Sequence, residues 1–443
     1  MKGETNMKRK LLGMAALSVL SVGLLAGCGG GDSKKENSDP GEIKVWVQFS
    51  DETPEGVAWQ EIVDGFNKEN EGKYKAVTEY IPRSGSGGGY EDKVNAAITT
   101  NGLPDVITLD GPNTAAYAHS GVIAPLDEYL KDADMDDVLD SIVQQGTYDG
   151  KMYAFGFSES NVGVYYNKAM FKEAGITEEQ LPTLDKPWTW SEFSKISETL
   201  TKHFEGPAID MQIASNDEML TYAYTPFIWS NGGDVVNEDG TKATGYFNDE
   251  KTVEALEFIQ GLVKNGYTTI SPIEKGFETG KYPMLLSGSW AIFDLEENYK
   301  DIDYGILPYP VSDTTKELVS PTGSWQLAMT TKTEKKDASA EFIKYATSTE
   351  SSRIMSLGNS VLPIRNSTIE LIKDEVSDGM RTLMEQNQRS GRARPVVVAY
   401  PQVSRAFQQA IQDVSYFEEN KDVQKVADTR AEEMQQAIDN SLK

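Results

Sequence analysis

The residues with the clearest chemical potential form a short polar loop between a strand and a helix. Asp110 to Asn113 reads Asp-Gly-Pro-Asn and follows residues 106–109, a β-branched apolar run typical of a strand buried on both faces. A helical stretch ending at Gly121 comes next. Because ligands of open α/β sheets bind beyond the carboxyl ends of strands, Asp110 and Asn113 are candidates for hydrogen bonds to a small ligand. The same residue types are equally typical of a plain surface turn, and both interpretations stay open.

Charge and composition exclude several classes of binding partner and of chemistry. Its net charge is −27, and residues 1–27 contribute +3, so the remainder carries −30. An acidic surface of this kind repels nucleic acid and anionic lipid head groups. The single cysteine, Cys28, excludes an intramolecular disulfide. The two histidines, His119 and His203, show no zinc-ligand spacing, and we expect no metal and no cofactor.

Two stretches imitate known ion and phosphate motifs without completing them. Residues 132–136 alternate aspartates as a calcium loop does, but Asp137 stands where the loop needs Gly and Val143 where it needs Glu. Residues 84–89 are rich in glycine, but no Gly-Lys-Ser/Thr follows, so they do not predict a phosphate loop.

The amino-terminal residues carry the pattern of an export signal. Three basic residues, 8–10, precede an apolar run, 11–26, that is slightly short for a spanning helix. The run ends Leu-Ala-Gly-Cys at Cys28, which closely resembles the signal of bacterial lipoproteins. That resemblance implies a signal peptide over 1–27, a diacylglycerol on the Cys28 sulfur and a stable membrane anchor. Residues 28–40 are polar and glycine-rich, which indicates a flexible tether.

Strand and helix patterns alternate after the tether. We expect strands over 42–47 and 74–81, each followed by a helix, over 57–70 and 90–100, and hence a parallel or mixed sheet flanked by helices.

The middle of the chain predicts a crossing between two structural units. Strands over 151–157 and 162–168 are joined by a polar segment that contains Glu159 and Asn161, and such strands can carry the chain from one lobe to another. Later stretches, 403–411 and 423–442, are helical, so the carboxyl end is expected to be all-α.

Several blocks occur in an order that resembles the extracellular solute-binding proteins of bacterial ABC importers, in particular the class that binds sugars and oligosaccharides, typified by maltose-binding protein. The blocks are residues 90–93 through 103–106, 120–126, 165–168 with Phe171, 280–290, 303–308 and 323–328. The resemblance implies an α/β, two-lobe periplasmic-binding-protein-like fold of type II, with hinge strands and a helical carboxyl-terminal region. It implies one lobe from 41–158 plus 302–347 and the other from 159–301 plus 348–443, with the ligand in the cleft between them.

The resemblance also implies which residues contact the ligand. The family places an aromatic residue at Tyr222 and tryptophans at Trp290 and Trp325, where flat rings stack on the apolar faces of sugars. Similar proteins use the loop after the first strand, which here comprises Phe49, Ser50 and Asp51. With these we group the polar candidates Asp110, Asn113, Glu159 and Asn161, whose amides and carboxylates suit sugar hydroxyls. Leu109 replaces a tryptophan of maltose-binding protein, which favours a saccharide other than maltodextrin.

The resemblance implies a monomeric binder that closes on its ligand and delivers it to ABC permease subunits from the outer face of the cell membrane. A lipid-anchored glycoside hydrolase is the alternative from another class, with Asp110 and Glu159 as its paired carboxylates. A third interpretation keeps the fold and changes the ligand to a glycerol phosphate or a peptide. A phosphate would need a cation in the cleft, for which Arg394 is the candidate.

Overall fold

The computed structural model describes residues 41–83, 89–215 and 217–443. The predicted signal peptide and tether, with Cys28, therefore lie outside the described residues, as does most of the glycine-rich loop.

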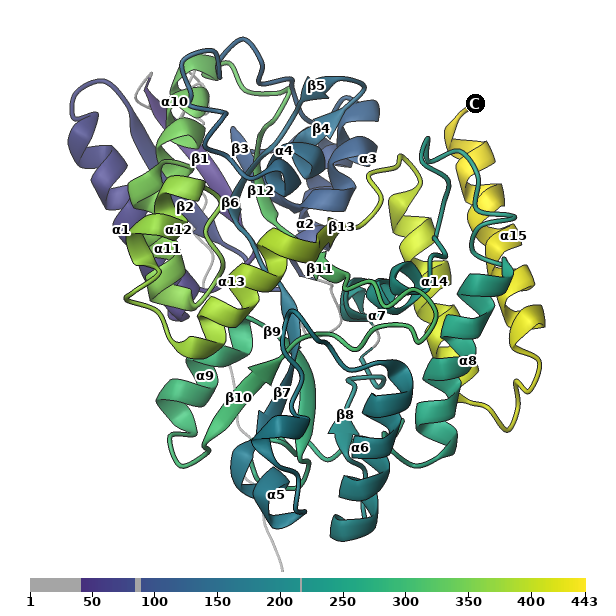
Figure 1. The fold of residues 1–443 in the computed structure, drawn as a ribbon. Coiled ribbons are helices and arrows are strands. Elements are labelled where there is room, and N and C mark those ends of the chain that lie inside the picture. Colours follow the sequence, from purple (N-terminus) through teal and green to yellow (C-terminus); the bar gives the residue numbers. More distant parts are fainter. Residues whose placement is uncertain (1–40, 84–88, 216) are drawn as a thin grey trace, which may run out of the picture. The chain divides into compact units, whose positions relative to one another are not determined.

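A five-stranded mixed sheet organises the first half of the structure, in the order β2-β1-β3-β12-β6 (Figure 1). The central strand β3 joins a parallel half to an antiparallel half, because β1 runs parallel to β2 and β3 whereas β12 runs antiparallel to β3 and β6. The strands are β1 (Glu42–Val47), β2 (Lys75–Tyr80), β3 (Val106–Asp110), β6 (Phe155–Ser158) and β12 (Trp325–Met329). The mixed sheet confirms the prediction from the alternating pattern.

A second sheet has the order β10-β7-β9-β8, with β7 antiparallel to both of its neighbours and β8 parallel to β9. Its strands are β7 (Val162–Asn167), β8 (Ile209–Asp210), β9 (Met284–Gly288) and β10 (Tyr304–Leu307). Two small sheets pair β11 (Ser320–Thr322) with β13 (Gly391–Ala393) and β4 (Thr147–Tyr148) with β5 (Lys151–Met152). The strand β13 precedes the carboxyl-terminal region, where α14 (Tyr400–Ser415) and α15 (Val423–Ser441) confirm the expected helices.

Helices surround both larger sheets. They are α1 (Pro54–Glu69), α2 (Tyr90–Thr100), α3 (Thr114–His119), α4 (Asp140–Gly146), α5 (Lys168–Glu173), α6 (Trp190–Phe204), α7 (Glu218–Ser230), α8 (Glu250–Lys264), α9 (Trp290–Asn298), α10 (Lys336–Ala346), α11 (Thr349–Asn359), α12 (Asn366–Ile372), α13 (Asp378–Ser390), α14 (Tyr400–Ser415) and α15 (Val423–Ser441). Two short 3₁₀ turns, Gly111–Asn113 and Glu178–Gln180, complete the set. In Figure 1, α14 lies against α15 and α8 at the carboxyl end of the chain.

The first core shows why the sequence folds as it does. Helix α1 begins after Thr53, whose side chain accepts a hydrogen bond from the Gly56 amide. Its apolar face buries Trp59 and Phe66, and Phe342 of α10 packs edge-on against both rings. Full burial of such side chains contributes about 1.5–3 kcal/mol each, which fixes α1 and α10 on the sheet.

The strands β6 and β7, which the sequence expects to carry the chain between lobes, belong to different sheets. Two elements pack with the lobe opposite to the one in which the predicted boundaries place them. β10 continues the hydrogen bonding of β7, and α11 packs against α1 and buries Met355 in the first core. The lobe boundaries stay a prediction.

Candidate functional site

Strand register brings the first candidate residues side by side. Trp325, the first residue of β12, pairs with Asp110 at the carboxyl end of β3 and with Ser158 at the end of β6. The loop that begins at Asp110 therefore lies at the same sheet edge as an aromatic side chain.

The second sheet contributes a tryptophan through the end of β9. Gly288 closes β9 opposite Val162, and Trp290 opens α9 two residues later. The Trp290 ring lies so close to Gly288 that a Cβ there would collide with it. The Tyr222 ring of α7 lies 6.2 Å from the Trp290 ring, centroid to centroid, tilted by 34°. Trp290 is 42% exposed, which leaves much of its surface available to a ligand.

These side chains line one cavity of about 300 Å³. It brings together Asp110, Glu159, Tyr222, Trp290, Trp325 and Arg394, which are six of the eleven candidates named from the sequence. The remaining lining residues are Glu55, Arg83, Ser158, Ser160, Asp217, Glu218, Met219, Gly323, Asn359 and Val361. Whether any of them contacts a ligand stays a prediction.

Arg394 joins three separate elements across the cavity wall. Its guanidinium donates to both carboxylate oxygens of Asp110, at 2.8 and 3.0 Å, and to Glu218 at the start of α7, at 2.6 Å. Burial opposes its charge, but the carboxylates outweigh that effect and hold the pKa of Arg394 well above its usual range. Burial also raises the pKa of Glu218, although Arg394 lowers it. The only side chain proposed for a phosphate is thus already bound by two carboxylates.

The crossing segment between β6 and β7 separates its two candidates. Glu159 lines the cavity, accepts from Ser141 Oγ at 2.8 Å and from the Ser160 amide at 2.9 Å, and has its pKa raised by burial. Asn161 is fully buried and lines none of the cavities described here. Its side-chain amide donates to Ser320 Oγ and the Pro321 carbonyl, so it fastens the crossing segment instead.

The loop after β1, with the candidates Phe49, Ser50 and Asp51, does not line this cavity, and its contact with a ligand stays a prediction. Phe49 is 6% exposed because its ring packs against Trp59 and Tyr80 in the first core. The Ser50 carbonyl accepts from the Thr53 hydroxyl at 2.6 Å, and Asp51 is exposed beside it. The chain turns into α1 at this point.

Glu55 and Arg83 are cavity residues that sequence reasoning missed. The guanidinium of Arg83 lies 5.2 Å from the Trp325 ring, and its Nε is 3.0 Å from Glu91. Arg83 follows the carboxyl end of β2, so the rule that selected Asp110 could also have found it. Glu55 lies in the first turn of α1, where no motif marks it, and burial raises its pKa to about 7.

A polar cavity of about 660 Å³ lies beside the first and shares four lining residues with it, Arg83, Asp110, Asp217 and Glu218. Asn113 lines this second cavity, which gives that candidate a place beside the aromatic site. Side chains of α14, among them Gln408 and Gln409, form its far side.

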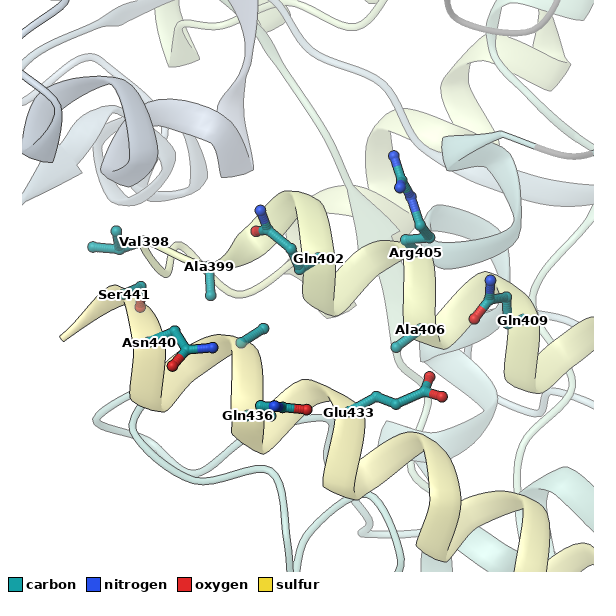
Figure 2. Close-up of a pocket in the computed structure, with 11 residues that line it drawn as sticks. Val398, Ala399, Gln402, Arg405, Ala406, Gln409, Glu433, Gln436, Asn440 and Ser441 are labelled. Carbon is teal, nitrogen blue, oxygen red and sulfur yellow. The ribbon is translucent and has the colours of Figure 1, made fainter. Parts of the chain in front are cut away.

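Another groove, of about 540 Å³, runs between α14 and α15. Figure 2 shows that its lining comes from these helices and the segment before α14, with amide, charged and small side chains such as Gln402, Arg405 and Asn440. No aromatic ring and no candidate residue lines it.

Within the described ranges, no group of three or more His, Cys, Asp or Glu side chains is arranged to hold a metal ion. A search of the same ranges finds no helix with the length and apolar character needed to cross a membrane.

Two α/β sheets linked by crossing strands, with an aromatic and polar cavity at the strand ends, define a small-molecule-binding protein of the periplasmic-binding type. The profile of the bacterial extracellular solute-binding protein family matches residues 50–352, and the chain belongs to this family.

Similar proteins agree with this assignment. The diacetylchitobiose-binding protein DasA of Streptomyces coelicolor is 28% identical over 379 residues, which cover 81% of this chain and 82% of that protein. A cyclic α-maltosyl-1,6-maltose-binding protein from Arthrobacter globiformis has a similar solved structure, with a TM-score of 0.77 and 24% identity over 90% of this chain and 99% of that chain. UgpB from Mycobacterium tuberculosis, solved with glycerophosphocholine, reaches a TM-score of 0.75 at 21% identity, covering 91% and 100%. The two-lobe α/β fold class predicted from the sequence is confirmed.

Proposed function

We propose that the protein binds a sugar or oligosaccharide outside the cytoplasm and delivers it to an ABC importer. The observation that carries this proposal is the shared cavity of Tyr222, Trp290 and Trp325. Sugars present flat C–H faces surrounded by hydroxyl groups, so aromatic rings suit the faces and carboxylates suit the rim. The saccharide ligands named for DasA and for the Arthrobacter protein support the same ligand class.

The proposed mechanism is closure of two lobes on the ligand, with the connections near residues 159–161 as part of the hinge. Ligand that contacts both lobes stabilises the closed form, since only a difference in affinity between two states shifts their populations. The bridge from Asp110 through Arg394 to Glu218 joins the first sheet to α7, so it is a contact that opening of the lobes would have to break. The permease would then recognise the closed form.

Membrane attachment is proposed through a lipid on Cys28, with residues 28–40 as a tether. The support is the lipoprotein-like sequence before Cys28 and the extracellular character of the family. Two or more acyl chains suffice for stable anchoring. The acidic charge also disfavours nucleic acid as a partner. We further propose that the protein is a monomer.

The hydrolase alternative is disfavoured by the partners of its two carboxylates. Asp110 is bound through both oxygens by Arg394, and Glu159 accepts from Ser141 and a backbone amide. A glycosidase needs one carboxyl group free to protonate the leaving oxygen and the other to act as base or nucleophile. We therefore propose binding without bond cleavage.

A glycerol phosphate ligand is the second candidate, because a Brucella abortus sn-glycerol-3-phosphate-binding protein is 28% identical over 269 residues. The contacts of Arg394 disfavour a phosphate ligand, because two carboxylates already bind its guanidinium.

The test is calorimetric titration with mono- and oligosaccharides, glycerol 3-phosphate and glycerophosphocholine, on the wild type, Trp290→Ala and Tyr246→Ala. The exposed fraction of Tyr246, 39%, is similar to the 42% of Trp290, and Tyr246 does not line the aromatic cavity, so it is a matched control. We expect a saccharide to bind, Trp290→Ala to weaken binding by tenfold or more through loss of stacking worth about 1–3 kcal/mol, and Tyr246→Ala to leave it unchanged. Binding of glycerol 3-phosphate alone would refute the proposal.

A further inference from the structure

The charged side chains that line the aromatic cavity differ in whether a partner already holds them. Both lining cations are engaged: Arg394 by Asp110 and Glu218, and Arg83 by Glu91 at 3.0 Å. An anionic group of a ligand would therefore have to share either guanidinium with a carboxylate that already binds it.

Two of the lining carboxylates are engaged by neutral donors. Asp217 accepts from the Met219 amide at 2.9 Å and so caps α7. Glu159 accepts from Ser141 and from the Ser160 amide. Both carboxylates therefore already accept hydrogen bonds from within the protein.

Glu55 is different. From the described residues, no hydrogen bond or ion pair reaches its carboxylate, and Arg83 acts on it only as a more distant charge. Its place in the first turn of α1 favours a negative charge there, although burial opposes it and raises its pKa to about 7. Among the described lining residues five are acidic (Glu55, Asp110, Glu159, Asp217, Glu218) and two are basic (Arg83, Arg394), a formal charge of −3 when all five carboxyl groups are ionised. The charged group of the cavity that lacks a direct partner among the described residues is therefore acidic, the carboxyl group of Glu55.

From this imbalance, and resting on the saccharide function proposed above, we propose that the cavity selects a saccharide with a protonated amino group, and that Glu55 pairs with the ammonium. A glucosamine unit satisfies both features of the site: its ring face stacks on Trp290 or Trp325, and its ammonium donates to the free carboxylate. A uronic acid or a sugar phosphate would add negative charge to a cavity whose two lining cations already pair with carboxylates.

The experiment compares three β-1,4-linked disaccharides that differ only at carbon 2: chitobiose with free amines, N,N′-diacetylchitobiose and cellobiose. These carry an ammonium, an acetamide and a hydroxyl group, so stacking surface and linkage are held constant. Galactosamine with galactose and glucosamine with glucose provide matched pairs on other rings. Affinity is measured by calorimetry at low salt and pH 7.5, above the pKa of about 7 of the Glu55 carboxyl, for the wild type and Glu55→Gln.

We expect the amino form to bind at least about tenfold more tightly than the hydroxyl form, since a charge-assisted hydrogen bond adds to the shared stacking. Glu55→Gln should abolish that preference, so that the amino and hydroxyl forms bind the variant with affinities within about twofold of each other. The matched control Glu52→Gln, an exposed carboxyl that does not line the cavity, should leave the preference intact. Circular dichroism establishes that each variant is folded.

The failure of this inference differs from the failure of the proposed function. If a neutral or N-acetylated saccharide binds and every amino form binds equally or more weakly, the ammonium preference is overturned while saccharide binding stands. The same holds if the preference survives Glu55→Gln. If no saccharide of any kind binds, both fail.

Discussion

The bridge centred on Arg394 makes a quantitative prediction for Asp110→Asn. The substitution keeps the shape of the side chain but replaces the carboxylate with a neutral amide. That carboxylate accepts two hydrogen bonds, at 2.8 and 3.0 Å, from the guanidinium of Arg394, whose side chain is only 4% exposed. Charge-assisted hydrogen bonds at buried sites contribute about 1.5–3 kcal/mol, so we expect a loss of about 2.5 kcal/mol in the free energy of unfolding. For about 400 residues at about 2.1 cal/mol/K each, the melting temperature should fall by roughly 3 °C.

Urea unfolding followed by circular dichroism measures this loss, and Asp185→Asn is the matched control. Asp185 also pairs with an arginine, Arg389 at 2.7 Å, but its side chain is 86% exposed. An exposed pair contributes about 0–1 kcal/mol, so the control should change stability little. Equal effects of the two substitutions would refute the reasoning that burial gives the Arg394 bridge its strength.

Three further predictions concern other residues. Because burial raises the pKa of Glu55 from 4.5 to about 7, the folded protein holds this proton more tightly than the unfolded chain, and the carboxyl group lowers stability as the pH rises through that window. Glu55→Gln should therefore raise the free energy of unfolding by about 3 kcal/mol at pH 8 and by less than about 0.5 kcal/mol at pH 4.5. Equal melting shifts at both pH values would contradict this. Gly288→Ala should displace the Trp290 ring and weaken ligand binding about tenfold. The control Gly261→Ala, in open space on α8, should leave the affinity unchanged. An unchanged calorimetric affinity in Gly288→Ala would count against the packing of Trp290 on Gly288. Cys28→Ser should move the protein from the membrane to the soluble fraction of cells, and retention on the membrane would exclude the proposed anchor.

Local pattern predicted the elements that bear the site, because each depends on nearby residues. The strand and loop at Asp110 follow from a β-branched run and a turn sequence. The capping box of Thr189 and Glu192 at the start of α6 likewise depends on residues three positions apart. Trp290 and Trp325 came from the family resemblance instead, since nothing in their own surroundings separates them from core residues such as Trp59.

The contacts that sequence reasoning could not predict are long-range ones. Phe49 is drawn into the first core by Trp59, although its loop resembles that of ligand-contacting relatives. Arg394 pairs with Asp110, 284 positions away, and no local pattern encodes such a contact. Glu55 enters the cavity because Thr53 starts α1 just before it, a placement that only the packed structure defines.

The most direct test of a solute site between Trp290 and Trp325 is fluorine NMR of protein labelled with fluorotryptophan. The chain has seven tryptophans, and five of them, Trp46, Trp59, Trp188, Trp190 and Trp229, are at most 8% exposed. Assigned by single substitutions, the resonances of Trp290 and Trp325 should shift most and saturably as the bound saccharide is added. Saturable shifts confined to the five buried tryptophans, with Trp290 and Trp325 unmoved, would contradict the account.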